Sequence, residues 1–241
     1  MPSNQETLEA LKDFDTPSIT NVVATYPGNP LCLGLYNPWS QNWYTDTSLR
    51  CWYPELGAVA GYAVTCVYGL PDPNYEGLSL ADVIAAMDAS PDPTIFIFEQ
   101  RFPPEIANKV GLSGGNMTTA MKVSGCVGAI SNGPSRDIDE IREMNFQYLT
   151  GGVCAGHGNM AIHAVNVPVS VAGMDVAPGE VIHMDENGAV KFPPQYLSEV
   201  LERVTTLREQ EAEHMARLRQ AKNAAEVRAI LGGGHYEEEK P

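Results

Sequence analysis

The chain has 241 residues, of which 44% are hydrophobic, so it can bury a sizeable core in one large domain or two small ones. Thirty acidic and 15 basic residues give a net charge of −15, which would repel a nucleic acid and argues against nucleic-acid binding. No apolar run approaches the roughly 18 to 20 residues that span a bilayer, and five scattered cysteines without a C-x-x-C pair favour a cytoplasmic protein without disulfides.

The N-terminal part predicts two short helices followed by a long loop. The first helix is expected over residues 6–14, and Thr16 is expected to cap the second helix, with Pro17 at its first position. Residues 26–57 have no clear period and contain all three tryptophans among many prolines and glycines. This composition predicts a long aromatic loop, and loops of that length are often functional.

The rest of the chain alternates strand and helix patterns before it ends in a long helix. We list the expected strands as 58–68, 94–98, 127–131, 165–171, 181–184 and 189–192, and the expected helices as 79–87, 112–123, 137–144 and a last one from Gln195 into the 220s. Together these elements predict an α/β protein. We expect one domain over residues 1–231 and a disordered acidic tail over 232–241, where glycines and like charges cannot pack.

The segment 114–140 carries the residues best suited to chemistry. It reads as a glycine turn that enters a helix, then a buried strand, then a loop with Arg136 and Asp137 at the start of another helix. Free N–H groups at such a helix start can hold a small carboxylate, and they belong here to Gly115, Asn116 and Met117. Arg136 can bind a carboxylate through two hydrogen bonds, and Asp137 can bind a divalent cation. The alternative is a surface ion pair at a helix start.

The same segment resembles a known family. Its pattern is Gly115, twenty intervening residues, Arg136 and Asp137, two residues, and Glu140. The segments DFDTPSITNVV, AVAGYAVTC and VNVPVSVAGMDVAPGEVIHMDENGAVKFPP accompany it in the expected order. The chain thereby resembles the RraA-like family, which includes class II 4-hydroxy-4-methyl-2-oxoglutarate/4-carboxy-4-hydroxy-2-oxoadipate aldolases and relatives that decarboxylate oxaloacetate.

The resemblance implies a swivelling β/β/α fold with short N-terminal helices and a C-terminal helix, assembled as a homotrimer or a dimer of trimers with clefts between subunits. It also implies a Mg²⁺ or Mn²⁺ ion held by Asp137 and water, with Glu140 bound to the metal through water. Arg136 and the turn formed by Gly114, Gly115, Asn116 and Met117 would then hold the pyruvyl group of a small 2-keto acid. A lyase of this kind works through a pyruvate enolate, whose charge the metal and Arg136 stabilise.

One departure from the family pattern bears on the reaction. Family aldolases commonly have an acidic residue directly after the motif glycine, whereas this chain has Asn116, which cannot accept a proton. Oxaloacetate decarboxylation needs no hydroxyl proton removed, so we expect it to tolerate this change better than aldol cleavage does. His157, in the flexible run 154–158, is the candidate substitute base, and a solvated loop histidine is the alternative.

Other residues are interpreted as structural. His183 is expected as a packed strand residue, residues 185–188 as a hairpin turn and Cys126 as core, while Glu99 and Arg101 follow a strand where cleft residues often lie. Two further functions stay open: a non-catalytic regulator that binds a ribonuclease, as some family members do, and a lyase for a larger keto acid admitted by the aromatic loop. The apolar face of the C-terminal helix suggests an oligomer contact.

Overall fold

The computed structural model describes residues 2–39, 42–75 and 77–232, so the predicted tail lies, apart from Gly232, outside the described residues. The α-helices are α1 (Asn4–Leu11), α2 (Thr16–Val23), α3 (Leu80–Asp88), α4 (Pro104–Ala107), α5 (Gly115–Val123), α6 (Ile138–Glu143), α7 (Leu197–Gln220) and α8 (Ala224–Leu231). The strands are β1 (Arg50–Cys51), β2 (Val59–Gly69), β3 (Thr94–Arg101), β4 (Cys126–Ser135), β5 (Gln147–Val153), β6 (Ala161–Val165), β7 (Val169–Val171), β8 (Met174–Val176), β9 (Val181–Asp185) and β10 (Gly188–Phe192).

The main sheet places four parallel strands side by side. Its order is β1-β5-β4-β3-β2-β9-β10, with β6 also paired to β2. The pairs β2–β3, β3–β4 and β4–β5 are parallel, and the connections between them carry α3, α5 and α6. Parallel strands end at the same edge of a sheet, and ligand sites commonly form there. The segments that follow β3, β4 and β5 therefore meet at one edge.

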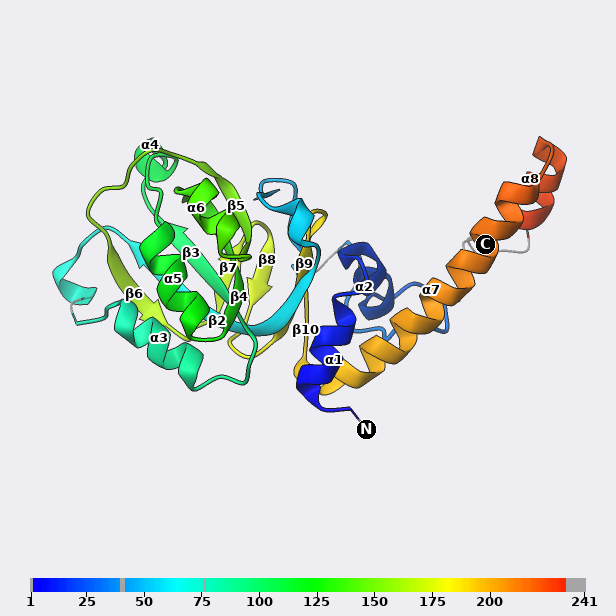
Figure 1. The fold of residues 1–241 in the computed structure, drawn as a ribbon, viewed down its shortest axis with the longest axis horizontal. Helices are drawn as coiled ribbons and strands as arrows, with labels where there is room; N and C mark the ends of the chain where they lie inside the picture. Colours follow the sequence, from blue (N-terminus) through cyan, green and yellow to red (C-terminus); the bar gives the residue numbers. More distant parts are fainter. Residues whose placement is uncertain (1, 40–41, 76, 233–241) are drawn as a thin grey trace.

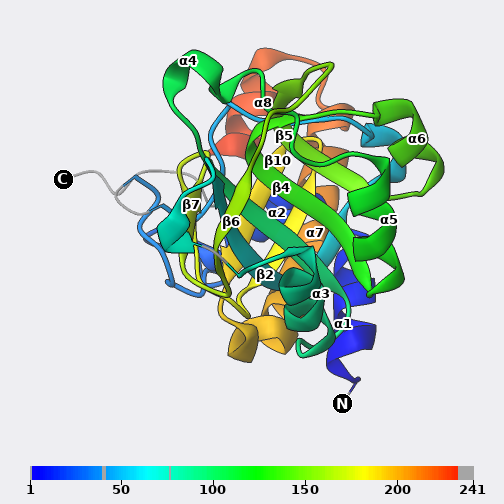
Figure 2. The ribbon, with the colours of Figure 1, turned by 90° about the vertical axis from the view of Figure 1, so that its left-hand side faces the viewer.

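Helices cover the sheet in two separate groups. Helices α3, α5 and α6 lie together at one end of the molecule, while α1, α2 and α7 gather beside β9 and β10 (Figure 1). Seen from the left of that view, α3 and α5 lie in front of the strands and α7 lies behind them (Figure 2). Each group has its own apolar core, and the pair β7–β8 closes a third core on the sheet. The expected α/β class, with N-terminal helices and a C-terminal helix, is confirmed.

The N-terminal helices form where they were expected, but one cap was predicted wrongly. Asp15, not Thr16, caps α2, because the Asp15 carboxylate accepts a hydrogen bond from Ser18 N at 3.0 Å. Thr16 is buried instead, and its hydroxyl lies 2.9 Å from His183 Nδ1. The sequence does not distinguish the two residues, because both Asp and Thr are good caps.

Most expected elements in the middle of the chain are confirmed, while several boundaries differ. The strand expected over residues 165–171 is instead divided into β6, which ends at Val165, and β7, which begins at Val169. Strands β3 and β4 run beyond their apolar parts to Arg101 and Ser135, and α5 begins only at Gly115. The residues just before it are extended, since Leu112 N donates to Pro134 O at 3.3 Å. Helix α8 was not predicted. Among the described residues, no helix is long and apolar enough to cross a membrane.

Candidate functional site

The loop that enters α5 is fixed to the end of β4. Ser135 Oγ donates to Ser113 O at 2.9 Å, and Arg136 N donates to the same carbonyl at 3.1 Å. Both serines are buried, so water does not compete for these bonds. This attachment places the start of α5 beside Arg136 and Asp137, at the carboxyl edge of the parallel strands.

Asp137 is turned away from its own helix and toward α5. It precedes α6 with φ 59° and ψ 36°, a left-handed conformation that Asp tolerates better than most residues. Its side chain makes no capping bond to α6. Instead, Oδ2 accepts a hydrogen bond from Gly115 N at 3.1 Å. The backbone conformation of Asp137 thus directs a carboxylate toward the glycine turn.

The two glycines permit three polar side chains to approach the turn. A Cβ atom on Gly114 would overlap the Asp137 carboxylate and contact the Arg136 side chain. A Cβ atom on Gly115 would overlap the Glu140 carboxylate. Neither glycine has a positive φ, so close approach explains their presence better than backbone freedom does. The structure therefore brings together five predicted site residues. We call this group, which consists of Gly114, Gly115, Arg136, Asp137 and Glu140, the glycine corner.

Arg136 retains its hydrogen-bonding capacity. Its Nε lies 3.6 Å from Asp137 Oδ2, and its side chain is 34% exposed, against 39% for Asp137. Within the described part of the chain, the buried Nε has no hydrogen-bond partner. An unsatisfied buried donor costs about 1–3 kcal/mol unless something binds it. Arg136 is therefore suited to receive an anionic ligand.

The first turn of α5 has two free backbone N–H groups, rather than the three that were expected. Asp137 occupies the Gly115 amide, whereas the N–H groups of Asn116 and Met117 have no partner among the described residues. Asn116 is exposed, while Met117 packs half-buried against the core beneath α5. A carboxylate placed at this helix start would meet free N–H groups and the positive end of the helix dipole.

A divalent cation fits this corner with few protein ligands. The carboxylates of Asp137 and Glu140 lie over adjacent glycines, and no group of three His, Cys, Asp or Glu side chains suited to a metal occurs in the described ranges. Mg²⁺ typically keeps several waters and binds through one or two carboxylates. The donor set therefore suits a hard, largely hydrated cation, and it does not suit zinc, which prefers nitrogen and sulfur ligands.

His157 lies near the corner but does not join it. The loop 154–158 is held next to β4, because Cys154 N donates to Ser135 O at 3.0 Å and Gly111 N donates to Gly156 O at 2.9 Å. The exposed His157 ring bonds to the adjacent Gly158 carbonyl at 3.0 Å, and no hydrogen bond to Arg136 or Asp137 is present among the described residues. The ring is accessible from solvent, and its role as a base stays a prediction.

The aromatic loop contributes two features that sequence reasoning missed. Its end braces α6: Tyr53 Oη donates to Ile138 O at 2.7 Å, and Glu55 pairs with Arg142. The middle of the loop forms one side of a cavity of about 300 Å³ beside α2. The cavity is lined by Thr16, Pro17, Thr20, Tyr26, Pro38, Trp39, Trp43, Tyr44, Thr45, Asn187 and Ala189. The lining contains neither Arg136 nor Asp137, so within one chain this cavity is separate from the glycine corner. No local sequence pattern predicts a contact such as that between Tyr53 and Ile138, which are 85 residues apart.

The residues expected in the core and in the hairpin turn lie there, while Glu99 and Arg101, which were considered as cleft residues, pair with each other. His183 is fully buried in β9, and Asp185 and Gly188 bound the turn of the β9–β10 hairpin. Burial raises the pKa of the Cys126 thiol to about 11, which fits a core residue and not a nucleophile. Glu99 pairs with Arg101 at 2.7 Å and accepts from Ser170 N at 3.1 Å, so its carboxylate holds β7 against the sheet.

The sequence and the fold resemble those of known proteins. Residues 40–191 match the model of a family described as RraA-like, Aldolase/RraA. A protein of Halalkalibacterium halodurans, provisionally named 4-hydroxy-4-methyl-2-oxoglutarate aldolase, is 30% identical over 112 residues, which are 46% of this chain and 52% of that protein. An uncharacterized protein of Methanocaldococcus jannaschii is 27% identical over 115 residues, or 47% of this chain and 55% of that one. The matches thus span about half the length of these curated relatives.

A solved structure supports the fold over nearly the whole chain. It is that of Streptomyces coelicolor RraAS2, described as an unusual member of the RNase ES inhibitor RraA protein family. The TM-score is 0.63 at 17% identity, and the match covers 90% of this chain and 97% of that one. At this identity, the likeness shows the fold alone.

Proposed function

The chain belongs to the Aldolase/RraA family, and from this premise we propose that it is a divalent-metal-dependent lyase that breaks a carbon–carbon bond in a small 2-keto acid. The observation that carries the proposal is the corner where Asp137 turns from its own helix to the Gly115 amide, beside an Arg136 with free donors. A structural ion pair would satisfy both partners. This corner leaves hydrogen-bonding groups of both residues open to a ligand.

The substrate's pyruvyl carboxylate would bind to the positive groups of the corner. Arg136 supplies a planar fork of donors that matches a carboxylate, and the amides of Asn116 and Met117 supply two more donors. These donors are fixed in place before the substrate arrives, because the bonds to Ser113 O hold β4 and the turn together. Fixed donors stabilise negative charge that develops during a reaction more effectively than water does.

Asp137 and Glu140 would hold Mg²⁺ or Mn²⁺ next to this anion site, with Glu140 acting through bound water. When bound, the cation acts as a Lewis acid that stabilises the negative charge developing on the substrate's keto oxygen. Asp137 Oδ2 is oriented by the Gly115 N–H, so Oδ1, which has no hydrogen bond among the described residues, is the oxygen available to the cation. An oriented ligand of this kind commonly improves metal affinity.

Asn116 favours decarboxylation over aldol cleavage. Aldol cleavage requires a base for the substrate's hydroxyl proton, and an amide cannot take it. Decarboxylation of a 2-keto acid such as oxaloacetate loses carbon dioxide and leaves the same enolate without that proton transfer. Within the described part of one chain, the carboxylates placed at Gly115, next to Asn116, are those of Asp137 and Glu140, which this proposal assigns to the cation. We therefore expect oxaloacetate to be the better substrate, and a base, if present, to come from His157 or a neighbouring subunit.

Ligand binding tests the proposal without relying on turnover. In a calorimetric titration, Mn²⁺ should bind the protein, and oxalate, a planar mimic of the pyruvate enolate, should bind much more tightly when Mn²⁺ is present. Asp137→Asn should abolish this coupling, because the amide lacks the charge that binds the cation. Asp139→Asn is the matched control, since Asp139 is an exposed carboxylate on α6 that does not contact the glycine turn.

The non-catalytic alternative gives the opposite result. A family member that acts only by binding another protein needs no metal corner. Absence of Mn²⁺-dependent oxalate binding in the unmodified protein would remove the lyase proposal and leave a binding protein. Equal coupling in Asp137→Asn would show instead that the metal binds elsewhere.

A further inference from the structure

The cavity beside α2, which we call the aromatic cavity, has the features of a second ligand site. Its walls come from three separate segments, namely the first part of α2, the aromatic loop and the β9–β10 hairpin. Its volume of about 300 Å³ is at the small end of the range for ligand sites. The aromatic cavity therefore suits a small molecule or the head group of a larger one.

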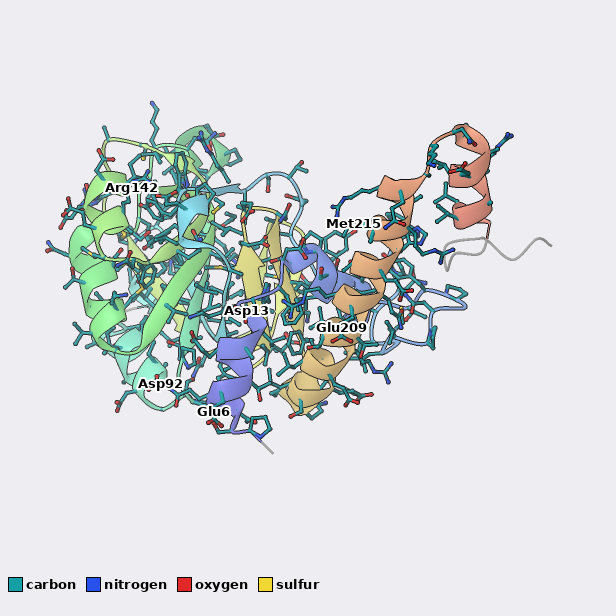
Figure 3. The ribbon with its side chains drawn as sticks, turned by 45° about the vertical axis from the view of Figure 1, so that its right-hand side comes forward. Glu6, Asp13, Asp92, Arg142, Glu209 and Met215 are labelled. Atoms are coloured by element: carbon teal, nitrogen blue, oxygen red, sulfur yellow. The ribbon has the colours of Figure 1, made fainter. Side chains whose placement is uncertain are left out.

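The aromatic loop is held in place on both sides of the cavity. Its middle pairs with β10, because Thr45 N donates to Ala189 O at 2.9 Å and Ala189 N donates to Thr45 Oγ1, also at 2.9 Å. Its first part lies against α7, where Arg203 donates to Pro30 O at 3.2 Å and to Cys32 O at 2.8 Å (Figure 3). The walls are thus fixed before a ligand arrives, which lowers the entropy cost of binding.

The aromatic side chains that line the cavity are Tyr26, Trp39, Trp43 and Tyr44. The rings of Trp43 and Tyr44 are nearly perpendicular, with centroids 4.7 Å apart and an angle of 78° between their planes. Trp43 is buried, and its Nε1 donates to Asn37 O at 3.1 Å, so its ring is fixed. Trp39 is 89% exposed, although tryptophan is highly buried in most proteins. The Trp39 ring is therefore available to a ligand at the rim of the cavity.

The protein places its own cations over other aromatic rings, but not over these. Arg50 Cζ, for example, lies 4.6 Å from the centre of the Trp52 ring. In the described ranges, no cation of the chain lies over Trp39, Trp43 or Tyr44. The face of an aromatic ring carries partial negative charge and attracts a cation. The rings of the cavity therefore leave this attraction to a ligand.

The charge around the cavity favours a cation over an anion. Among the described residues, the lining contains no Lys, Arg or His. The Asp185 carboxylate lies directly behind the lining, because it accepts hydrogen bonds from Thr16 N and Asn187 N, each at 2.8 Å. Asp185 is 2% exposed and forms no ion pair in the described part of the chain, while the exposed Asp46 and Glu186 adjoin lining residues in sequence. The cavity is thus poorly suited to the larger keto acid considered above.

We propose that the aromatic cavity binds a small organic cation that carries a methylated ammonium group. The methyl groups would be buried against the rings, which attract the positive charge, and the Asp185 carboxylate behind the wall would add to this attraction. A methylated ammonium fits better than a primary one, because a primary ammonium brings three N–H donors that each need an acceptor. A neutral sugar could also pack on aromatic rings, but it would gain nothing from the buried carboxylate.

Calorimetric titration of the whole chain with two probes of the same shape tests the proposal. Choline carries the positive charge, and 3,3-dimethylbutan-1-ol replaces its nitrogen with an uncharged carbon. We expect choline to bind at least about tenfold more tightly, because only choline gains the attraction to the rings. Equal affinities for the two probes, or no binding of choline, would overturn the proposal. Tighter binding of methyl glucoside than of choline would also overturn it and would indicate a sugar site.

Two variants at Trp39 test whether the cation binds in this cavity. Trp39→Leu keeps an apolar side chain but removes the ring, and we expect choline to bind about tenfold more weakly, whereas Trp39→Phe keeps a ring and should stay within about threefold of the unmodified protein. Because Trp39 is so exposed, circular dichroism should be unchanged in both variants. Metal-dependent oxalate binding should also be unchanged, since the cavity shares no residue with the glycine corner. Undiminished binding of choline to Trp39→Leu would place the cation elsewhere and overturn the assignment.

Discussion

Asp137 is the residue on which the proposed chemistry depends most. The sequence pattern predicted that it would follow a buried strand, and it follows β4; the family resemblance implied that it would share a site with the glycine turn, and its carboxylate binds the Gly115 amide. Its left-handed backbone and the bond from Gly115 N to Oδ2 could not be predicted, because they arise from the contact between α5 and β4. Likewise, the resemblance suggested Glu140 as a neighbour of the cation, but only the structure shows its carboxylate over Gly115.

The first prediction at this scale concerns Gly115→Ala. The added methyl group would overlap the Glu140 carboxylate, so Glu140 or the turn must shift. We expect metal-dependent decarboxylation to fall by about 100-fold, as when one fixed group of an active site is lost. Gly152→Ala is the matched control, because its new methyl group would make only an ordinary contact of 4.0 Å with Pro134 Cβ. Equal kcat/KM values for the two variants would contradict the close approach described above.

The second prediction concerns Asn116→Asp. Asn116 is exposed at the start of α5, where a carboxylate is tolerated by the helix dipole and can accept a proton. We expect the ratio of aldol cleavage of 4-carboxy-4-hydroxy-2-oxoadipate to oxaloacetate decarboxylation to rise by at least about tenfold, within the range of general base catalysis. The measurement is pyruvate release from each substrate. An unchanged ratio would show that another group already serves as the base.

At the scale of elements, the connection between α2 and β9 fixes the N-terminal helices to the sheet. Thr16 N donates to Asp185 Oδ2 at 2.8 Å, and His183 Nε2 lies 3.1 Å from Leu11 O, which can only accept. His183 Nε2 therefore carries the proton, and Nδ1 accepts from the Thr16 hydroxyl. Burial of the ring favours this neutral form.

The third prediction is a loss of stability in mild acid that depends on His183. Burial lowers the pKa of His183 below its ordinary value, and hydrogen bonding to Leu11 O only partly opposes this. In the unfolded chain, the His183 side chain therefore binds a proton near pH 6.5, whereas in the folded chain it stays neutral at that pH. Stability is complete above that pH and falls as pH decreases below it, with a slope of up to about 1.4 kcal/mol per pH unit.

Thermal unfolding between pH 7.5 and 5.5 checks this. The Tm of the unmodified protein should fall across this interval, and His183→Gln, which cannot ionise, should show a smaller fall whatever its starting Tm. Equal changes in Tm for the two proteins would mean that protonation of His183 does not control this part of the fold.

The elements themselves were predictable where a pattern was local. The apolar runs of β3 and β4 and the helix α3 were predicted correctly, since an apolar run and the Ser79–Asp82 capping box at the start of α3 each involve neighbouring residues. The true start of α5 was missed because Leu112 and Ser113 pair with β4, a contact of more than 20 residues in sequence. Helix α8 was not predicted, and none of its residues is buried.

At the scale of the whole molecule, the middle of the chain and its two ends build separate regions. The parallel strands gather the candidate site at one edge of the sheet, beside α5 and α6, whereas α1, α2 and α7 build a separate core next to β9 and β10. The alternation of strand and helix patterns predicted an α/β protein and the charge argued against nucleic acids, but neither predicts the order of the strands in the sheet, which gathers the candidate site at one edge.

Pyruvate release from oxaloacetate is the measurement that tests the proposed lyase most directly. It should be followed with Mn²⁺ and with EDTA, for the unmodified protein, Asp137→Asn and the control Asp139→Asn. We predict release well above the rate with Mn²⁺ alone, abolished by EDTA, lowered by about 100-fold or more in Asp137→Asn and retained in Asp139→Asn. Release no faster than with the metal alone, or equally fast in Asp137→Asn, would contradict the assignment of this corner as the catalytic site.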